Sequence, residues 1–392
     1  MLGLFLPPST NALSPADIEG AARIAGRVGI ARQIAADKFE GRNNDTPGSA
    51  AIQELLLRRL KKIGTGPVPG RSGDDAYRQP FVEEDERGTN LFALIRGSEL
   101  PDEYVMIGGH YDHLGNRCPQ VRAGDDICNG ATDNGAGTAV VVAIARALAR
   151  LPAPPRRSIL IALWDAEEDG LLGSQYYIKN PVVPLASTVA YLNFDVQGGV
   201  LLPSLRYKSF AVGAETGGPI LASMVDAAVA AETLDTRRVS YIFGQGRSDY
   251  ANLVTAMVPT VFFGDSTGPC YHTTGDDLPR IDFRKLREQS QIGFRLTVAL
   301  AETETPPSFV PLNPALATFE DALVIDSVFD AGLADLDLFS PADRAIVANR
   351  QAAISAIVDE GEAAFDANDI ATVLLGTLDG IEAILRLECG QY

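Results

Sequence analysis

The sequence has little of what would place it in several large classes of protein. No apolar run approaches the roughly 18 residues that a membrane-spanning helix needs. With 33 Lys and Arg against 51 Asp and Glu, the formal net charge is −18, which argues against nucleic acid or an anionic membrane as the main partner. The four cysteines are too few for a disulfide scaffold. These shortages leave a protein that depends on an ordinary apolar core.

The chain is rich in apolar and acidic residues. Hydrophobic residues make up 46% of its 392 residues, enough for one large α/β domain, or for a domain of about 300 residues with an appendage. Acidic residues are concentrated near the C-terminus. Residues 305–392 hold fifteen Asp and Glu and three Lys and Arg, so this segment carries −12 of the net charge of −18. We interpret this as a solvated helical surface, with an acidic tail that binds a basic partner as the alternative.

Features of the cysteines and of the first residues bear on localisation. The start, MLGLFLPPST, is apolar without a preceding basic residue, so it is either the remnant of a signal peptide or a cloned start. Cys118 and Cys128 lie in one short polar loop, which suits a small disulfide. Cys270 either pairs with Cys389 or is a free buried thiol. Because disulfides persist in oxidising compartments, we expect an exported protein.

Helical and strand-like patterns alternate over the first 300 residues. Ser14 and Pro15 begin a helical pattern, and short apolar runs are typical of strands. The expected helices cover about 14–36, 48–63 and 135–151, with others from about 217, 248 and 283. The expected strands cover 87–97, 102–110, 156–164, 187–196 and 257–265. This alternation predicts an α/β fold, a three-layer αβα sandwich with a mixed, mostly parallel sheet.

The character of the chain changes after residue 304. Prolines gather between Pro306 and Pro314, and no strand-like run follows them. Ser340 opens a second helix-capping sequence, SPAD. We therefore predict a main domain over residues 1–304, a Pro-rich linker over 305–312 and an acidic helical C-terminal extension over 313–392. We expect the extension to be dispensable for chemistry, because no candidate ligand lies beyond the linker.

Polar side chains stand where the strand-like runs end. Each has an ordinary structural explanation: a helix cap for the Asp or Glu residues, or a hydrogen bond from His272 to Asp276 or Asp277. Together these explanations require unrelated coincidences at one edge of one sheet, where functional groups gather in such folds. A metal site is therefore the better interpretation. The residues concerned are His110, Asp112, His113, Asp133, Glu167, Glu168, Asp195 and His272.

The charge of the site supports two metal ions. Two divalent cations carry +4, and three carboxylate ligands with a bridging hydroxide carry −4, so the assembly is nearly neutral and less costly to bury. Imidazole and carboxylate ligands suit Zn²⁺, with Co²⁺ or Mn²⁺ as possible substitutes. One of two adjacent glutamates can then bind metal while the other moves protons. The predicted ligands are His110, Asp133, Glu168, Asp195 and His272.

The order H-x-D, D, E-E, D, H resembles that of the co-catalytic, di-zinc metallo-aminopeptidases of the bacterial leucyl-aminopeptidase type. The resemblance covers roughly residues 37–303 and is carried by GGHYDHLG, GATDNGAGTA, EEDGLLGS and YHTTGDD, with FEGRNNDTPGSAAI upstream. It implies that Asp133 bridges two Zn²⁺ ions. His110 and Asp195 would complete one site, and Glu168 and His272 the other.

The resemblance also implies the remaining roles. Glu167 would be the general base and acid, Asp112 would orient the first histidine, Tyr271 would help to stabilise the oxyanion, and Arg247 in GRSDY would contact the substrate. The peptide bond after the bridging Asp133 would be cis. The implied protein is a zinc-dependent exopeptidase, an aminopeptidase that removes the N-terminal residue from peptides with a free N-terminus. Hydrolysis would proceed through a metal-bridging water activated by Glu167.

Other functions remain open on the same fold. The main alternative is a single-zinc glutaminyl-peptide cyclase, which would use the same pair of glutamates. A carboxypeptidase of the related lid-domain type needs an extra domain, for which the 77 residues from Asp195 to His272 leave little room. A non-catalytic binding protein usually lacks a ligand or the base, whereas all six positions are filled here. The cysteine-bearing loop and the helical extension are departures from the family pattern, and no protease-associated insert stands between Phe81 and Val105.

Overall fold

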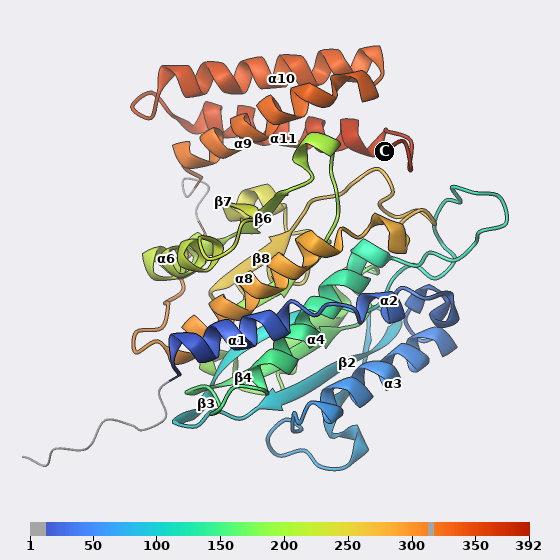
Figure 1. Cartoon of the computed structure of the whole chain (residues 1–392), viewed down its shortest axis with the longest axis vertical. Coiled ribbons are helices and arrows are strands. Elements are labelled where there is room, and N and C mark those ends of the chain that lie inside the picture. The colour runs from blue at the N-terminus through green and yellow to red at the C-terminus, as the bar shows by residue number, and fades with distance from the viewer. Residues whose placement is uncertain (1–12, 313–316) are drawn as a thin grey trace, which may run out of the picture.

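The computed structural model describes residues 13–312 and 317–392 (Figure 1). The apolar start that we considered a signal-peptide remnant lies outside the described residues, as does the start of the predicted extension at residue 313. A central sheet is covered by helices on both faces, and three further helices form a group beyond one end of the sheet.

One mixed sheet of eight strands forms the middle layer, in the order β1-β2-β4-β3-β5-β8-β6-β7. The four central strands, β4, β3, β5 and β8, are parallel, and antiparallel pairings join them to β2 on one side and β6 on the other. The predicted mixed, mostly parallel sheet is confirmed. The strands are β1 Arg78–Glu83, β2 Glu86–Ile95, β3 Leu100–His110, β4 Arg157–Trp164, β5 Thr188–Phe194, β6 Lys208–Val212, β7 Asp235–Val239 and β8 Thr260–Gly264.

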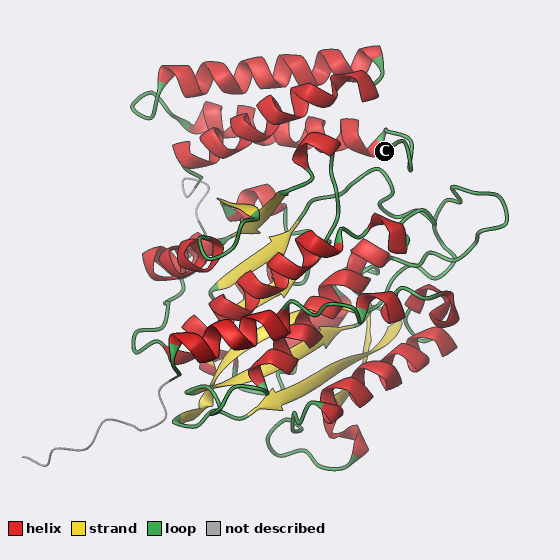
Figure 2. Ribbon diagram, viewed as in Figure 1, coloured by secondary structure: helices red, strands yellow, loops and turns green. Residues whose placement is uncertain are grey.

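Helices form the two outer layers (Figure 2). Their positions follow the predicted pattern closely, because amphipathic periodicity identifies the long ones. The helices of the main body are α1 Pro15–Ala25, α2 Ala31–Ile34, α3 Pro47–Lys62, α4 Gly137–Leu148, α5 Leu172–Lys179, α6 Gly218–Val229, α7 Tyr250–Thr255 and α8 Phe283–Glu302.

Strand β4 explains why the core strands read as continuous apolar runs. Every residue of β4 is buried, because successive side chains point to opposite faces and both faces are covered. Ile159 and Ile161 belong to the apolar cluster that contains α1, α4 and α8. Leu160 and Trp164 belong to the cluster that contains residues of α5 and α7. The sheet is therefore the middle of three layers, as predicted.

Three strands, one helix and one helix boundary differ from the prediction; the unpredicted helix is α5. The pattern missed β1, β6 and β7, which are short, lie in the outer part of the sheet and carry charged residues, so their apolar alternation is weak. The helix expected over 14–36 is two helices, because α1 ends before Gly26. A Cβ atom at Gly26 would lie 2.7 Å from Cγ of Arg287 on α8, so the close approach of α8 requires glycine there.

The C-terminal helices lie against the β6–β7 end of the sheet (Figure 1). They are α9 Phe319–Gly332, α10 Pro341–Glu360 and α11 Ala367–Leu385. Ser340 caps α10 as predicted, with its side chain accepting a 3.2 Å hydrogen bond from the backbone N–H of Asp343. Apolar side chains of all three helices join those of β6 and of the loop after β5 in one cluster. The predicted helical appendage is present, and the domain boundaries at 304 and 312 stay predictions.

Both expected disulfides are present. Cys118 pairs with Cys128 inside one loop, and Cys270 pairs with Cys389 across 119 positions of sequence. The second bridge resolves the alternative that the sequence left open for Cys270. It joins the segment after α11 to the loop that carries His272.

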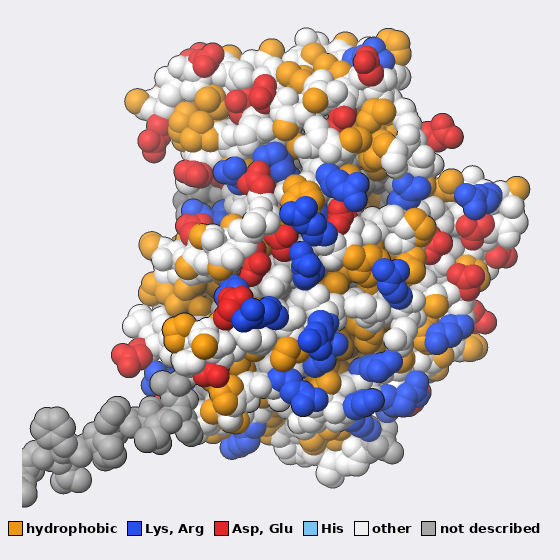
Figure 3. Space-filling view, in the orientation of Figure 1, with side chains coloured by type: hydrophobic (Ala, Val, Ile, Leu, Met, Phe, Trp, Pro, Cys, Tyr) orange, Lys and Arg blue, Asp and Glu red, His pale blue; other side chains and the backbone are white. Residues whose placement is uncertain are grey.

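The surface charge is uneven. On the face shown in Figure 3, Lys and Arg side chains gather over the helical layer that contains α1 and α8, although the net charge of the chain is −18. Exposed members of this group include Arg23 and Arg27 near α1 and Arg284 and Arg287 on α8. Over the described residues, no helix combines the length and the apolar character needed to cross a membrane.

Candidate metal centre

The polar residues predicted for the site come together at the carboxyl ends of the central strands. His110 ends β3, Glu167 and Glu168 follow β4, and Asp195 follows β5 directly. Asp133 lies in the turn before α4. His272 follows β8 after a loop and has a left-handed backbone conformation, with φ 53°.

Sharp turns point the side chains inward. Ala166, just before the glutamate pair, and Val196, just after Asp195, have φ of 53° and 47°. Left-handed backbone is unfavourable for residues with a Cβ atom and is maintained by the surrounding structure, often at functional sites. The chain thus reverses where each strand ends and presents its carboxylates at one point.

Asp133 stands between two groups of potential ligands. Its Oδ1 lies 3.2 Å from Nε2 of His110, which is also 3.1 Å from Oδ1 of Asp195. Its Oδ2 lies 3.1 Å from Nε2 of His272, which is also 3.0 Å from Oε2 of Glu168. Each oxygen of Asp133 therefore serves a different group. The five side chains that the sequence predicted as ligands fall into the two groups that the family resemblance implies.

The fit to metal ions can be tested on the donor atoms themselves. Among the described residues, neither Nε2 of His272 nor Oδ2 of Asp133 makes a hydrogen bond, although both are buried and lie close together. Buried polar atoms normally have hydrogen-bond partners. Around a tetrahedral zinc ion with bonds of about 2.0 Å, neighbouring ligand atoms lie about 3.3 Å apart. The unpartnered atoms and the 3.0–3.2 Å spacings therefore fit zinc at both groups.

The two adjacent glutamates have opposite electrostatic environments. Burial raises the pKa of Glu167 well above its ordinary value, and the carboxylates of Asp195 and Glu168 add to this against the opposing effect of His110. Burial acts in the same direction on Glu168, but His113 and His272 lower its pKa to about 2. A pair of carboxyl groups with separated pKa values is the usual arrangement for distinct chemical roles.

The turn that carries Asp133 is held by the backbone and by a second carboxylate. The Asp133–Asn134 peptide bond is cis, as expected. Asp276 accepts hydrogen bonds from the backbone N–H of Thr132 and Asp133, at 3.0 Å each. The side chain of Asp133 makes no cap hydrogen bond to α4, so the ordinary explanation as a helix cap does not apply. Asp276 supports the ligand turn, and Asp277 accepts a hydrogen bond from the backbone N–H of Leu278. The carboxylates close to Nε2 of His272 are instead those of Asp133 and Glu168, so the ordinary explanation for that histidine does not apply.

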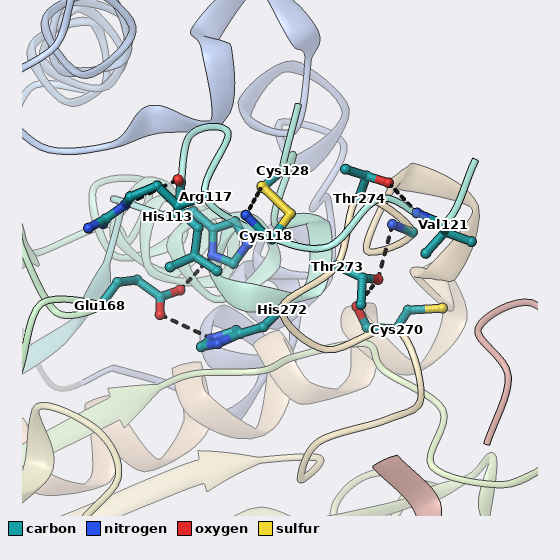
Figure 4. Close-up of a disulfide and its surroundings, with 12 residues drawn as sticks. His113, Arg117, Cys118, Val121, Cys128, Glu168, Cys270, His272, Thr273 and Thr274 are labelled. Carbon is teal, nitrogen blue, oxygen red and sulfur yellow. Dashed lines mark hydrogen bonds and ion pairs between the residues drawn. A yellow bond between two sulfur atoms is a disulfide. The ribbon is translucent and has the colours of Figure 1, made fainter. Parts of the chain in front are cut away.

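Asp112 and His113 support the site from behind. Oδ1 of Asp112 lies 3.4 Å from Nδ1 of His110, and its Oδ2 accepts a 3.2 Å hydrogen bond from the backbone N–H of Glu168. His113 is fully buried, and its Nδ1 lies 2.5 Å from Oε1 of Glu168. Figure 4 shows that His113 and His272 approach Glu168 from two sides.

His113 is a residue to which the sequence reasoning gave no role. One of its ring nitrogens lies within 4.8 Å of carboxylate oxygens of Asp133 and Glu168, so His113 is a second candidate, beside His272, for the histidine of this ligand group. Nδ1 of His113 is hydrogen-bonded to Glu168, and among the described residues its Nε2 is unpartnered, as is Nε2 of His272. Nε2 of His272, however, lies 3.1 Å from Oδ2 of Asp133 and 3.0 Å from Oε2 of Glu168. The geometry favours His272 as the ligand. The signal that could have found His113 is its place in the sequence H-x-D-H, since the chain has three histidines in all.

Arg42 is a second residue that the sequence reasoning missed. It is completely buried and donates hydrogen bonds to the carbonyl oxygens of Tyr111, Asn129 and Gly130. These carbonyls belong to the segments that carry His110 and Asp133. Burial lowers the pKa of Arg42 to about 10, against the opposing effect of Asp112 and other acidic groups. Arg42 thus ties two ligand segments together and offsets part of their negative charge.

Tyr271 and Arg247 lie beside the centre. The Tyr271 ring stacks on the His272 ring, with centroids 3.8 Å apart, and the Arg247 guanidinium lies 6.0 Å from the Tyr271 ring centroid. Both residues line a cavity together with Asp133, Glu167 and Asp195. Burial raises the pKa of Tyr271, and the carboxylates of Asp133 and Glu168 raise it further, so its hydroxyl stays a hydrogen-bond donor.

A three-layer α/β fold with two groups of zinc-type donors at its strand ends is the architecture expected of a metallopeptidase domain. Comparison with known proteins agrees. The family model described as Peptidase family M28 matches residues 90–296. The chain belongs to this family, and the matched residues include every side chain assigned above to the two ligand groups.

Curated relatives share about three tenths of the aligned residues. Leupeptin-inactivating enzyme 1 of Streptomyces exfoliatus is 29% identical over 270 residues, which are 61% of this chain and 57% of the relative. A probable glutamate carboxypeptidase of Arabidopsis thaliana is 31% identical over 258 residues, which are 59% of this chain and 34% of the relative. The chain therefore spans about a third to just over half the length of these relatives.

Solved structures share the fold. The aminopeptidase LapA of Legionella pneumophila superposes with a TM-score of 0.58 at 18% identity, over 76% of this chain and 79% of that chain. A glutaminyl cyclase of Porphyromonas gingivalis superposes with a TM-score of 0.56 at 19% identity, over 70% of this chain and 96% of that chain. At these identities the likeness concerns the fold alone, so it does not separate peptidase from cyclase.

Proposed function

We propose that this protein is a zinc-dependent aminopeptidase that hydrolyses the N-terminal residue from peptides. Two Zn²⁺ ions would be held by His110, Asp133 and Asp195 and by Asp133, Glu168 and His272. The observation that carries the proposal is the placement of Asp133, whose two carboxylate oxygens lie 3.2 and 3.1 Å from histidine nitrogens of different groups. Membership of the M28 family supports peptide-bond hydrolysis as the class of reaction.

Bound zinc would supply a Lewis acid and lower the pKa of a coordinated water. The acid–base work falls to Glu167, which lines the cavity beside Asp133 and Asp195 without belonging to either ligand group. Its carboxylate would accept the proton of the attacking water and return it to the departing amine. Burial raises the pKa of Glu167 well above its ordinary value when no cation is present. Positive charge at the ligand groups would stabilise the ionised form that acts as the base.

Two further side chains would act on the substrate. The Tyr271 hydroxyl would donate a hydrogen bond to the oxyanion that develops at the scissile carbonyl. Arg247 would contact the substrate from the rim of the cavity that it lines with Tyr271. The surplus of carboxylates at the centre would attract the substrate's free ammonium group, which favours removal of a single N-terminal residue.

The glutaminyl-peptide cyclase remains the alternative, and the aminopeptidase is favoured by one feature. A single-zinc enzyme needs one complete ligand group. Here both groups are complete: besides the group of His272, Nε2 of His110 lies within 3.2 Å of both Asp133 and Asp195.

We also infer that the protein is exported and that its domains divide at residues 304 and 312. Two disulfides among the described residues support an oxidising compartment. The absence of helix and strand between the end of α8 and residue 312 supports a linker there.

One panel of substrates tests the reaction. Zinc-loaded protein should release nitroaniline from aminoacyl-nitroanilides, should lose this activity with a chelator and should not act on the same substrates after N-acetylation. Elemental analysis should give two zinc ions per chain. Cyclisation of an N-terminal Gln peptide with one zinc per active chain would support the cyclase, and cleavage of N-blocked peptides ending in Glu would support a carboxypeptidase.

A further inference from the structure

A cavity of about 170 Å³ extends from the candidate metal centre toward the C-terminal helices. Asp133, Glu167, Asp195, Arg247 and Tyr271 line its polar end. The rest of its wall is largely apolar and comes from two parts of the chain that are far apart in sequence. The cavity is thus continuous with the groups that carry the proposed chemistry.

The far wall belongs to the C-terminal helices. Val328 and Phe329 of α9 and Ile381 of α11 line it, facing Leu202 of the loop after β5 and Val212 of β6. The M28 match ends at residue 296, so α9 and α11 lie outside the region that identifies the family. The expectation that the extension is dispensable for the chemistry stays a prediction, and it leaves a role in substrate binding open. The extension contributes no candidate ligand among its described residues, but it forms one side of the cavity.

Specific contacts fix this wall relative to the centre. Asp321 at the start of α9 accepts hydrogen bonds of 2.7 Å from both the backbone N–H and the hydroxyl of Ser240. The backbone N–H of Ser204 donates to Asp335 at 2.8 Å, next to the loop that faces α9 across the cavity. The Cys270–Cys389 disulfide joins the segment after α11 to the loop of His272. The wall and the ligands are thus parts of one connected structure.

The volume and the lining of the cavity indicate which kind of substrate side chain it would hold. An apolar cavity of roughly 150 Å³ accommodates a benzene ring, so 170 Å³ suits the side chain of Phe, Leu or Met. A charged side chain would lose its hydration against the apolar wall without gaining a partner there. A small side chain would leave part of the cavity empty and forgo apolar contact.

We propose that α9 and α11 form the wall of the pocket for the substrate's first side chain and thereby restrict the enzyme to peptides with a large apolar N-terminal residue. The proposal rests on the function proposed above and adds its substrate class. It makes the C-terminal extension a determinant of specificity, acting through Val328, Phe329 and Ile381.

The test compares inward and outward substitutions on the same helices. Ile381→Trp on α11 and Val328→Trp on α9 fill the cavity. Leu375→Trp and Leu323→Trp are the matched controls, because these residues are 50% and 41% exposed and do not line it. Phe329→Ala enlarges the cavity. Zinc content and thermal melting establish that each zinc-loaded full-length variant is folded.

The readout is the ratio of kcat/KM for Leu-nitroanilide to that for Ala-nitroanilide. In the wild type this ratio should exceed ten, since one methylene in an apolar pocket already gives 10–200-fold discrimination. The filling variants should lower the ratio at least tenfold, and the controls should leave it within twofold. Phe329→Ala should shift preference toward a naphthylalanine substrate, which keeps the proposal testable if a Trp variant fails to fold.

The outcomes separate this proposal from the proposed function. If the wild type cleaves the substrates but the filling variants keep the wild-type ratio, the pocket assignment is wrong while the aminopeptidase stands. If no aminoacyl-nitroanilide is cleaved, the proposed function fails. In that case, the affinities of the wild type and the same variants for leucinamide and for alaninamide, measured by calorimetry, test the pocket assignment independently of catalysis. Equal binding of both amides by the wild type would overturn that assignment.

Discussion

Carboxylates at the sheet edge and carboxylates in the C-terminal helices are the same chemical groups in opposite surroundings. Asp133 and Asp195 are 3% and 4% exposed and converge with histidines. In the extension, the Asp337 side chain is fully exposed beside Arg344, and the Glu382 side chain is 68% exposed beside Arg386. A buried carboxylate needs a cation, a hydrogen-bond donor or a proton, whereas an exposed one needs water alone. Burial alone does not mark a functional carboxylate, since Asp321 and Asp343 of the extension are 4% and 8% exposed; the convergence of several carboxylates with histidines does.

The largest effects are expected when the two adjacent glutamates of the buried site are substituted one at a time. Glu167→Gln keeps the size of the side chain but removes the proton acceptor, so kcat should fall by roughly 10²–10⁴-fold with two zinc ions retained. Glu168→Gln should lose zinc at low free zinc and regain part of its activity with excess zinc. Steady-state kinetics with elemental analysis measures both effects. Zinc loss in Glu167→Gln with retention in Glu168→Gln would exchange the two roles.

The two disulfides offer a comparison of stability between the regions. The Cys270–Cys389 bridge spans 119 positions and Cys118–Cys128 spans ten. In the chain-entropy model these loops correspond to roughly 5 and roughly 2.5 kcal/mol of unfolding free energy. Paired Cys→Ser substitutions at each bridge should therefore destabilise unequally in denaturant melts, more for the bridge that holds the extension. Equal losses would indicate that the apolar cluster alone holds α11 in place.

Much of this arrangement could be predicted from the sequence, for identifiable physical reasons. The strand before Glu167 is buried on both faces, so its apolar run and its end are visible in sequence. Asp195 and His272 could be placed from such strand ends, and Asp133 from the Gly-rich turn before α4. Strand β7 was missed because charged residues interrupt its pattern, and β6 because it is five residues long and begins with Lys208. The wall formed by Val328 and Ile381 depends on packing between segments more than a hundred residues apart, which no local pattern records.

His113 tests whether support behind a ligand matters as much as the ligand. His113→Gln removes the Nδ1 contact with Oε1 of Glu168. Loss of such a contact typically weakens metal binding 10–100-fold, so zinc affinity should fall by that amount and excess zinc should restore activity. Arg117→Gln is the control in the same loop, because Arg117 makes an exposed ion pair with Asp169. Equal zinc affinity of His113→Gln and the control would leave His113 as a packing residue only.

The smallest effect is expected from an acidic residue of the extension that lies away from the cavity. Asp343 accepts hydrogen bonds from Nε of Arg386 at 2.9 Å and from the Ser340 hydroxyl at 2.8 Å. The Arg386 side chain is 47% exposed, so this pair is screened by solvent and worth at most about 1 kcal/mol. Asp343→Asn should lower the unfolding free energy by no more than that and leave the Leu-to-Ala ratio of kcat/KM unchanged.

The pH dependence of this small effect has a definite sign. Hydrogen bonds from Arg386 and Ser340 lower the pKa of Asp343 in the folded state. The stabilisation is therefore fully present above the unfolded value near pH 4 and is lost as the pH falls through the lower folded value. Denaturant melts of wild type and Asp343→Asn should differ at pH 7 and converge as the pH falls below the unfolded value. A difference that grows in acid, or a change in substrate preference, would contradict the assignment of Asp343 to a local stabilising contact away from the metal centre.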